Sequence, residues 1–435
     1  MSNSRTDGRF TRLGMAAPFS LRWAGLFIPL LGAVLGGAVA VLAWGVGRTP
    51  AVSLLLPVLW ILMPSRVSAF CLAATYHMVV VRFIPELAGT WFDSSLVGYS
   101  LWVGLGVISG VAWAICWPRS GSPAWVVGSS IVVMLVLLVP PVAMALPGHP
   151  LVGVGFLAPG TGWFGVGGFF VAVAGACWFF RCKMQSIVGE RKWLIWSAVL
   201  ALGIMLWAAG GVPDPEKGKI AGRVGALTSM WGRFPDRDSV EVMLRIGKIG
   251  LATANLAGGD DGIDTVVFPE AVLGIYDPSL YPAMEQEVLR KTKLSGQTVV
   301  VGADLESGPN TYRGVAIVFR PDGSSSYIAA RMTVPVAQWA PWSNKVHFPS
   351  DWLGKSTLDV GGGIRARFMF CFEEYLPLLH LLSEAREDHV LVIAMSNLWA
   401  SDDPLTSYVQ GAHTEGMARL FNRKWVRSVN LAKTQ

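Results

Sequence analysis

The sequence predicts a polytopic α-helical membrane domain of about seven spans, residues 1–211, followed by an α/β domain, residues 212–435. The chain is 52% hydrophobic and only 15% charged, whereas an average soluble domain is about 25% charged. The long apolar runs lie in the first half, which holds 12 basic and 4 acidic residues. The second half holds 23 basic and 25 acidic residues, and its short β-rich runs alternate with amphipathic helical patterns.

Seven apolar runs are candidates for crossing the hydrocarbon core of a bilayer, which is ~30 Å thick and needs about 20 helical residues. The run Ala51–Met63 is short for this purpose, so the span count depends on it. No small-residue cleavage site follows the first run, which predicts a retained anchor rather than a signal peptide. The runs are Trp23–Val46, Ala51–Met63, Val67–Pro85, Leu96–Trp117, Ala124–Leu146, Trp163–Phe180 and Trp193–Ala209.

The basic residues of this half indicate its orientation. With the N-terminus inside, ten of them fall on the cytoplasmic side and only Arg48 and Arg82 on the other, a strong positive-inside bias. Seven spans then place residues 212–435 on the outer face of the membrane. Because these basic residues flank apolar runs, they are topology signals, and no direct binding to nucleic acid is expected. The ten are Arg5, Arg9, Arg12, Arg22, Arg66, Arg119, Arg181, Lys183, Arg191 and Lys192.

In the second half, apolar residues recur at helical spacing over Asp238–Leu256, which predicts a helix. Further helices are predicted over Glu374–Arg386 and Leu405–Val429. Five β-runs are "IDTVVFPE", "QTVVVGAD", "RGVAIVFRPDGSSSYIAARM" with a Pro-Asp-Gly hairpin turn, "ARFMFCF" and "VLVIAMSN". Strands that alternate with helices predict a layered α/β domain with its functional residues at the carboxyl ends of strands.

Three strand ends carry chemically active side chains: Glu270, Cys371 and the pair Ser396–Asn397. Cys371 is the only one of the five cysteines in the polar half, so its thiol has no disulfide partner there. It is a buried core residue, a metal ligand or a nucleophile. The six histidines show no metal-ligand spacing, and the chain has neither a Walker loop nor a GxGxxG motif. The sequence therefore predicts no metal and no cofactor.

The motifs "VVFPEAVLG", "CFEE", "GHPLVGVGF", "VPVAQW" and "SNLW" together resemble the apolipoprotein N-acyltransferase branch of the nitrilase (carbon–nitrogen hydrolase) superfamily. The resemblance covers nearly the whole chain, and the order and spacing of the motifs carry it. It implies an αββα sandwich with a Glu–Lys–Cys triad, in which Glu270 is the general base and Cys371 the nucleophile that forms an acyl thioester. It further implies Glu373 as a supporting carboxylate and Gln338, Asn397 and Trp399 as substrate-binding residues.

The same resemblance implies where the protein lies and what it meets. It places the chain in a bacterial inner membrane as a multi-pass protein, with the second domain on the periplasmic side. The expected partners are a membrane phospholipid as acyl donor and a lipoprotein or a protein of the conjugation apparatus as acceptor.

The sequence departs from the family pattern at the lysine. In "AARMTVPVAQW" the lysine position holds Ala330, and a motif glutamate is replaced by Gln338. Arg331 is a weak candidate to replace the lysine, because neighbours on a strand point to opposite faces. The chain also ends at Gln435 soon after the last predicted helix, so its α/β domain is expected to be C-terminally shortened. These features resemble the TraB-type conjugal transfer subgroup most closely.

Three interpretations remain open. The first is an inner-membrane enzyme that transfers or hydrolyses an acyl group through a cysteine thioester. The second is a catalytically impaired scaffold of plasmid conjugation, which Ala330 and Gln338 favour. The third is a genuine apolipoprotein N-acyltransferase. In all three, Glu374 is expected to be a first-turn acid that suits the helix dipole.

Overall fold

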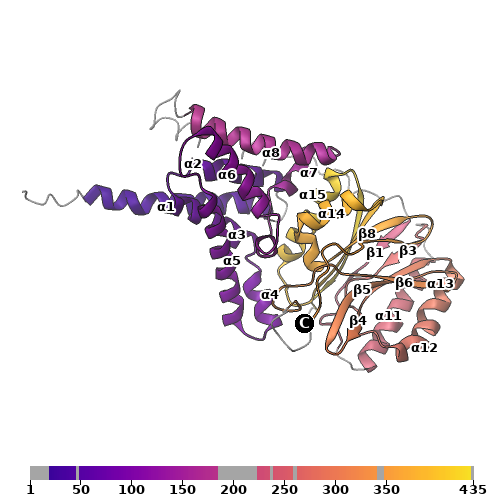
Figure 1. Ribbon diagram of the computed structural model, residues 1–435. Coiled ribbons are helices and arrows are strands. Elements are labelled where there is room, and N and C mark those ends of the chain that lie inside the picture. Colours follow the sequence, from indigo (N-terminus) through magenta and orange to yellow (C-terminus); the bar gives the residue numbers. More distant parts are fainter. Residues whose placement is uncertain are drawn as a thin grey trace, which may run out of the picture.

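The computed structural model describes residues 19–45, 49–184, 223–235, 239–257, 262–339 and 347–432. The chain forms a helical half, up to residue 184, that lies beside an α/β half, from residue 223 (Figure 1).

The helical half contains eight α-helices within the described residues, together with short 3₁₀ segments. Two of them are long and apolar enough to cross a bilayer, over Ser95–Cys116 and Gly162–Cys182. The helices are α1 (Phe19–Trp44), α2 (Leu56–Leu62), α3 (Arg66–Val80), α4 (Ile84–Trp91), α5 (Ser95–Cys116), α6 (Pro123–Val136), α7 (Leu151–Leu157) and α8 (Gly162–Trp178).

The expected seven spans are only partly reproduced. Helices occupy six of the seven predicted runs, and the seventh, Trp193–Ala209, lies outside the described residues. The run Val67–Pro85 is split into α3 and α4, which are bent by 59° and bring the number of candidate spans to at most three. Pro85 lies at the start of α4, where its missing backbone N–H cannot continue the hydrogen bonds of α3. The run Ala124–Leu146 is likewise shortened, because α6 ends before the prolines at 140 and 141.

The α/β half is built from two five-stranded sheets. The first has the order β1-β3-β4-β5-β6 and the second β2-β10-β9-β8-β7. Within the first sheet β1, β3 and β4 are parallel, and within the second β2, β10, β9 and β8 are parallel. The strands are β1 (Val224–Ala226), β2 (Thr228–Ser229), β3 (Thr265–Val267), β4 (Thr298–Gly308), β5 (Thr311–Phe319), β6 (Ser325–Ala329), β7 (Thr357–Asp359), β8 (Arg365–Phe370), β9 (Leu391–Leu398) and β10 (Lys424–Leu431).

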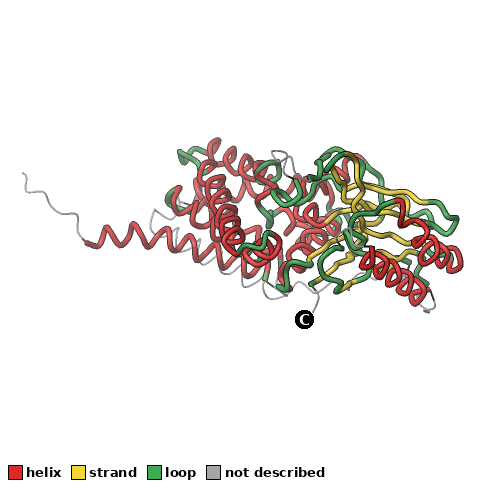
Figure 2. Tube along the Cα trace, turned by 90° about the horizontal axis from the view of Figure 1, so that it is seen from below, coloured by secondary structure: helices red, strands yellow, loops and turns green. Residues whose placement is uncertain are grey.

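The two sheets pack face to face between two layers of helices (Figures 1 and 2). Val267 and Val300 of the first sheet meet Phe368 and Ile393 of the second in a fully buried core. The helices α11 (Ser239–Ala257), α12 (Tyr281–Met284) and α13 (Arg290–Ser295) cover the first sheet, and α14 (Pro377–Arg386) and α15 (Pro404–Leu420) cover the second. This is the αββα sandwich that the motifs predict, and α11 confirms the helix expected over Asp238–Leu256.

The predicted final helix, Leu405–Val429, is wrong in its second half. The helix α15 ends at Leu420, Asn422 takes a left-handed conformation with φ +53, and the chain continues as β10. Along β10, residues pair with both β9 and β2, so the segment completes the second sheet. A further strand of the second sheet therefore follows the last helix, which the sequence pattern did not predict.

The helix α15 also joins the two halves of the molecule. At its crossing with α7, a methyl group added to Gly155 would lie 1.7 Å from the carbonyl oxygen of Gly416, so the two backbones are in direct contact. His413 of α15 accepts a hydrogen bond of 2.8 Å from the backbone N–H of Gly148 and stacks on Trp44. The "GHPLVGVGF" motif is thus a helix packed against the α/β half.

Candidate active site

Cys371 lies at a sharp elbow that follows β8 directly. It opens the 3₁₀ turn η6 (Cys371–Tyr375), and its φ is +33, in the left-handed region that non-glycine residues avoid. Such a conformation costs of order 1–3 kcal/mol and persists only where the surroundings hold it. The side chain stays partly accessible. This is the elbow that the sequence predicts for a nucleophile.

Glu270 faces the thiol from the end of β3. The side chain of Cys371 and the backbone N–H of Asn397 both act to lower the pKa of its carboxyl group. Burial raises the pKa of Glu270 to about 8, and the nearby carboxyl of Asp304 adds to the effect. The loop crosses β4 at Gly302, where a methyl group would lie 2.3 Å from the carbonyl oxygen of Pro269. The structure therefore brings the predicted base and nucleophile into contact.

The thiol is held in its neutral form at rest. Burial, and then the charge of Glu270, raise the pKa of Cys371 well above its usual value. Protonated Glu270 cannot accept the thiol proton, whereas the ionised carboxylate can. Reactivity of this thiol should therefore depend on how far Glu270 is ionised.

The position expected to hold a lysine faces this site. Alternation along the strands puts Asp304 and Ala330 on the face of the first sheet that packs against the second. A methyl group on Gly314 would lie 3.6 Å from Asp304 Oδ1 and 3.9 Å from Ala330 Cβ, so the three positions are neighbours. Burial raises the pKa of Asp304 to about 7. Asp304 was not singled out from the sequence, because it ends the run "QTVVVGAD" and was counted only as part of that predicted strand.

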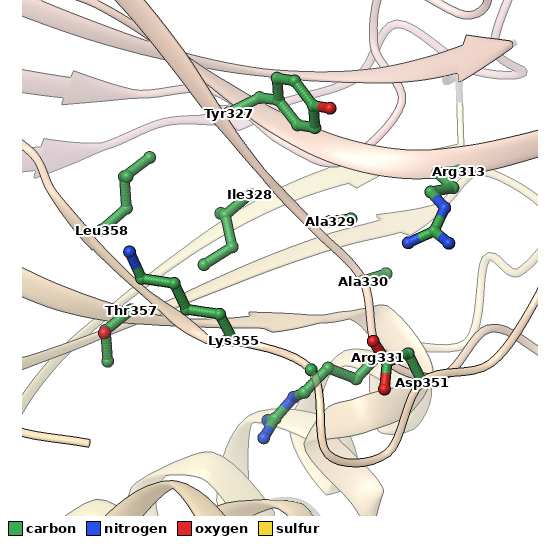
Figure 3. Close-up of a pocket in the computed structure, with 11 residues that line it drawn as sticks. Arg313, Tyr327, Ile328, Ala329, Ala330, Arg331, Asp351, Lys355, Thr357 and Leu358 are labelled. Atoms are coloured by element: carbon green, nitrogen blue, oxygen red, sulfur yellow. The ribbon is translucent and has the colours of Figure 1, made fainter. Parts of the chain in front are cut away.

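A cavity of about 180 Å³ opens beside Ala330 (Figure 3). Its lining includes neither Glu270 nor Cys371. In Figure 3 the guanidinium of Arg331 is directed away from Ala330 toward a helix, and Lys355 extends along Ile328 and Leu358. Neither Arg331 nor Lys355 thus occupies the lysine position. The lining residues are Arg313, Tyr327, Ile328, Ala329, Ala330, Arg331, Asp351, Gly354, Lys355, Thr357 and Leu358.

Arg331 lies between α14 and Glu373 of the turn that carries Cys371. Its guanidinium is 3% exposed, donates to Ser383 Oγ at 2.9 Å and to the carbonyl oxygen of Leu379 at 3.3 Å, and lies 4.0 Å from Glu373 Oε2. Both hydrogen-bond acceptors belong to α14. Arg331 is therefore a buried ion-pair residue, and the structure does not place it against Glu270 as a substitute for the lysine.

Glu373 is the supporting carboxylate of the elbow. It is 1% exposed, and its Oε1 accepts hydrogen bonds from the backbone N–H groups of Arg331 and, at 2.8 Å, of Met332. Its Oε2 accepts from the backbone N–H of Phe370 at 3.2 Å. Burial raises the pKa of Glu373, and the Arg331 charge opposes the rise. The side chain ties the segment after β6 to the turn that carries Cys371.

The three predicted substrate-binding residues lie in different surroundings. Asn397 donates to the carbonyl oxygen of Glu270 at 3.1 Å and accepts from Asn430 at 2.8 Å, so it holds the loop of the base. Gln338 accepts from the backbone N–H of Val334 at 3.1 Å and closes its own turn. Trp399 packs against Trp91 and Phe234, with ring centroids 5.5 and 6.1 Å away. Only Asn397 contacts the site.

Glu374 lies in the first turn of η6, as the sequence suggested, but its role goes beyond suiting the helix dipole. It is fully buried and accepts hydrogen bonds from Ser396 Oγ, from Thr414 Oγ1 at 2.7 Å and from Arg427 Nε at 3.0 Å. Arg427 lies on β10, inside the segment that was predicted to be helical. The sequence signal that could have found the pair is the alternation in "KWVRSVNL", which fits a strand.

Comparison with known proteins agrees with the motifs. The chain is 25% identical over 419 residues to the conjugal transfer protein TraB of Agrobacterium fabrum, covering 87% of each chain. The chain is a homologue of TraB. A probable TraB of Sinorhizobium fredii is 25% identical over 399 residues, covering 87% of this chain and 92% of the relative. No family model matches the chain.

Two solved structures resemble the α/β half. An amidase of the nitrilase superfamily from Nesterenkonia AN1 covers 48% of this chain and 78% of that chain, with a TM-score of 0.36 and 15% identity. A CN-hydrolase superfamily protein from Xanthomonas campestris covers 48% of this chain and 75% of that chain, with a TM-score of 0.35 and 14% identity. The predicted resemblance to TraB is confirmed by the relatives found along the sequence.

The first prediction concerns the pH dependence of the thiol. Glu270 ionises with a pKa of about 8, so alkylation of Cys371 by iodoacetamide should accelerate as pH rises through that value. In Glu270→Gln this step should vanish, and the remaining rise should follow the thiol itself at higher pH. Peptide-resolved mass spectrometry measures the rate, with Glu285→Gln on the exposed surface as the control. Identical profiles for wild type and Glu270→Gln would contradict the pairing.

The second prediction restores the missing cation. A lysine at position 330 would face Asp304 and favour the ionised carboxylates, so Ala330→Lys should lower the pKa of Glu270. The alkylation profile should move to lower pH, with roughly a tenfold gain in rate at pH 6 if the pKa falls by one unit. Ala330→Met has a similar length without charge and should leave the profile in place. A folded Ala330→Lys protein with the wild-type profile would show that position 330 does not face the site.

Proposed function

We propose that this chain is an inner-membrane conjugal transfer protein whose α/β half transfers an acyl group through a thioester on Cys371. The observation that carries the proposal is the pairing of Glu270 with the Cys371 thiol at a left-handed elbow, where each side chain shifts the pKa of the other. Both side chains are partly accessible, as the reacting groups of an enzyme must be. The similarity to TraB supports the role in conjugal transfer.

The proposed reaction has two steps, each with balanced protons. Glu270 takes the thiol proton while Sγ attacks the carbonyl carbon of an acyl ester, and the expelled alkoxide then receives that proton. The product is an acyl thioester on Cys371 and a free alcohol. In the second step an amine attacks the thioester, Glu270 takes its proton, and the thiolate leaves and is reprotonated. Water in place of the amine would release the free acid.

The position of the elbow supports a membrane phospholipid as acyl donor. Phe372 and Tyr375 of η6 pack against the apolar cluster of the helical half, and Tyr375 stacks on Phe83 with ring centroids 6.5 Å apart. An acyl chain held among these helices would thus lie beside the turn that carries Cys371. We propose a lipoprotein or a conjugation-apparatus protein as acceptor, and an orientation with the α/β half in the periplasm.

A second candidate function is a scaffold that keeps the fold without catalysis. Two observations favour it: Ala330 lies at the lysine position, and Cys371 is a neutral thiol at rest. Losing one member of a catalytic unit typically costs orders of magnitude in rate. The replacement of a motif glutamate by Gln338, which closes its own turn, likewise argues against the full activity of an apolipoprotein N-acyltransferase.

The third prediction separates the two functions. If Cys371 carries the acyl group, Cys371→Ala should lower plasmid transfer at least roughly tenfold. Mass spectrometry should then find a fatty-acyl adduct on Cys371 in wild-type protein. Cys182→Ala, which removes a cysteine of the helical half, should change neither result. Unchanged transfer together with the absence of an adduct would favour the scaffold and overturn the enzyme.

A further inference from the structure

Gln410 lies directly behind the nucleophile. It belongs to α15 and is fully buried. Its side-chain Nε2 donates a hydrogen bond of 2.6 Å to the carbonyl oxygen of Cys371, and the same amide counteracts the rise in the pKa of the thiol. An amide nitrogen carries two N–H groups, so one can serve the backbone and the other the sulfur. Gln410 was not singled out by any sequence motif.

Arg427 fixes the direction in which this amide points. Its Nη2 donates a hydrogen bond of 2.7 Å to Gln410 Oε1. A guanidinium can only donate, so the oxygen of the amide must face Arg427 and the nitrogen must face Cys371. Arg427 is itself held, because its Nε donates to Glu374 at 3.0 Å and its Nη1 donates to Ser407 Oγ at 2.8 Å.

A series of hydrogen bonds therefore runs from Glu374 through Arg427 and Gln410 to Cys371. In this series the Gln410 amide connects the Arg427 guanidinium to the residue that carries the nucleophile. Hydrogen bonds in series polarise one another, so an amide whose oxygen is bound to a cation is a stronger donor at its nitrogen. The charged groups that act on Cys371 are Glu270 and Glu374, both of which disfavour a thiolate, and the Tyr375 hydroxyl is coupled to the same thiol. The Gln410 amide favours the thiolate against these two acids.

We propose that Gln410, polarised by Arg427, is the positioning residue that makes Cys371 usable in a site where alanine stands at the lysine position. The proposal rests on the proposed function, and it deepens it by naming how the nucleophile is activated. The amide holds the carbonyl of a strained residue and donates to the sulfur as the thiol proton passes to Glu270. A lysine would supply a full charge from the opposite sheet, whereas Gln410 supplies a partial one from α15.

The fourth prediction tests Gln410 through the thiol itself. Gln410→Leu should shift the pH profile of Cys371 alkylation upward and slow it roughly tenfold at pH 7, the effect of one pKa unit well below the midpoint. Gln410→Glu keeps the partner of Arg427 but replaces the donor by an acceptor, so it should slow alkylation as well. Gln297→Leu is the matched control, because Gln297 is also buried and donates to a backbone carbonyl, that of Ile263 at 2.8 Å.

Thermal unfolding separates positioning from mere packing. The two Leu variants should lose similar stability, while only Gln410→Leu and Gln410→Glu alter the alkylation profile. Adding Ala330→Lys to Gln410→Leu should return the profile toward wild type. A wild-type profile in the Gln410 variants, an equal change in Gln297→Leu, or no recovery with Ala330→Lys would each overturn the proposal.

The readout also keeps this proposal separate from acyl transfer. Alkylation reports the thiol whether or not an acyl donor is used. If the alkylation profile depends on Gln410 but the protein carries no acyl adduct, the positioning role of Gln410 stands and the proposed acyl transfer is rejected. If the acyl adduct forms equally well in the Gln410 variants, the proposed acyl transfer stands and the positioning role of Gln410 is rejected.

Discussion

The backbone of Cys371 is the constraint around which the α/β half is arranged. A residue with a side chain is kept at φ +33 between a buried strand and a 3₁₀ turn, and this conformation must be held by its neighbours. Glu373, within the turn, accepts hydrogen bonds from the backbone N–H groups of Arg331 and Met332 after β6 and of Phe370 on β8. Gln410 grips the turn from α15 through the carbonyl oxygen of Cys371. With the turn held in this way, the Cys371 sulfur at the end of β8 faces Glu270, which follows β3 of the other sheet.

The helix α15 links this constraint to the rest of the molecule. One face packs on the second sheet and supplies Gln410 and Thr414 to the polar network. The other face contacts the helical half through Gly416 and His413. A rotation of α15 or an insertion at its contact with the helical half would therefore displace Gln410 and with it the backbone of Cys371. The two halves are expected to work as one unit.

The sequence was informative where residues next to each other in the chain determine the outcome. Glu270 and Cys371 each follow a short buried strand, one in each sheet. Their pairing was therefore expected from the family motifs, not from the strand pattern alone. The helix α11 was visible from its periodicity. Asp304 and Glu374 were missed or misread because their environments are made by strands far away in the chain. The strand β10 was read as helix because its pairing with β9 and β2 overrides a weak local pattern.

The enzyme and the scaffold differ in whether the buried acids beside Cys371 can ionise without a lysine nearby. Glu270 and Asp304 are buried acids with pKa values raised to about 8 and about 7, with Ala330 at the lysine position between the sheets. The most direct measurement is a single-turnover assay with vesicles that contain a phospholipid with a labelled acyl chain. The account predicts label on wild-type Cys371 that neutral hydroxylamine releases, and none on Cys371→Ala. Folded wild-type protein that acquires no label on Cys371 would contradict it.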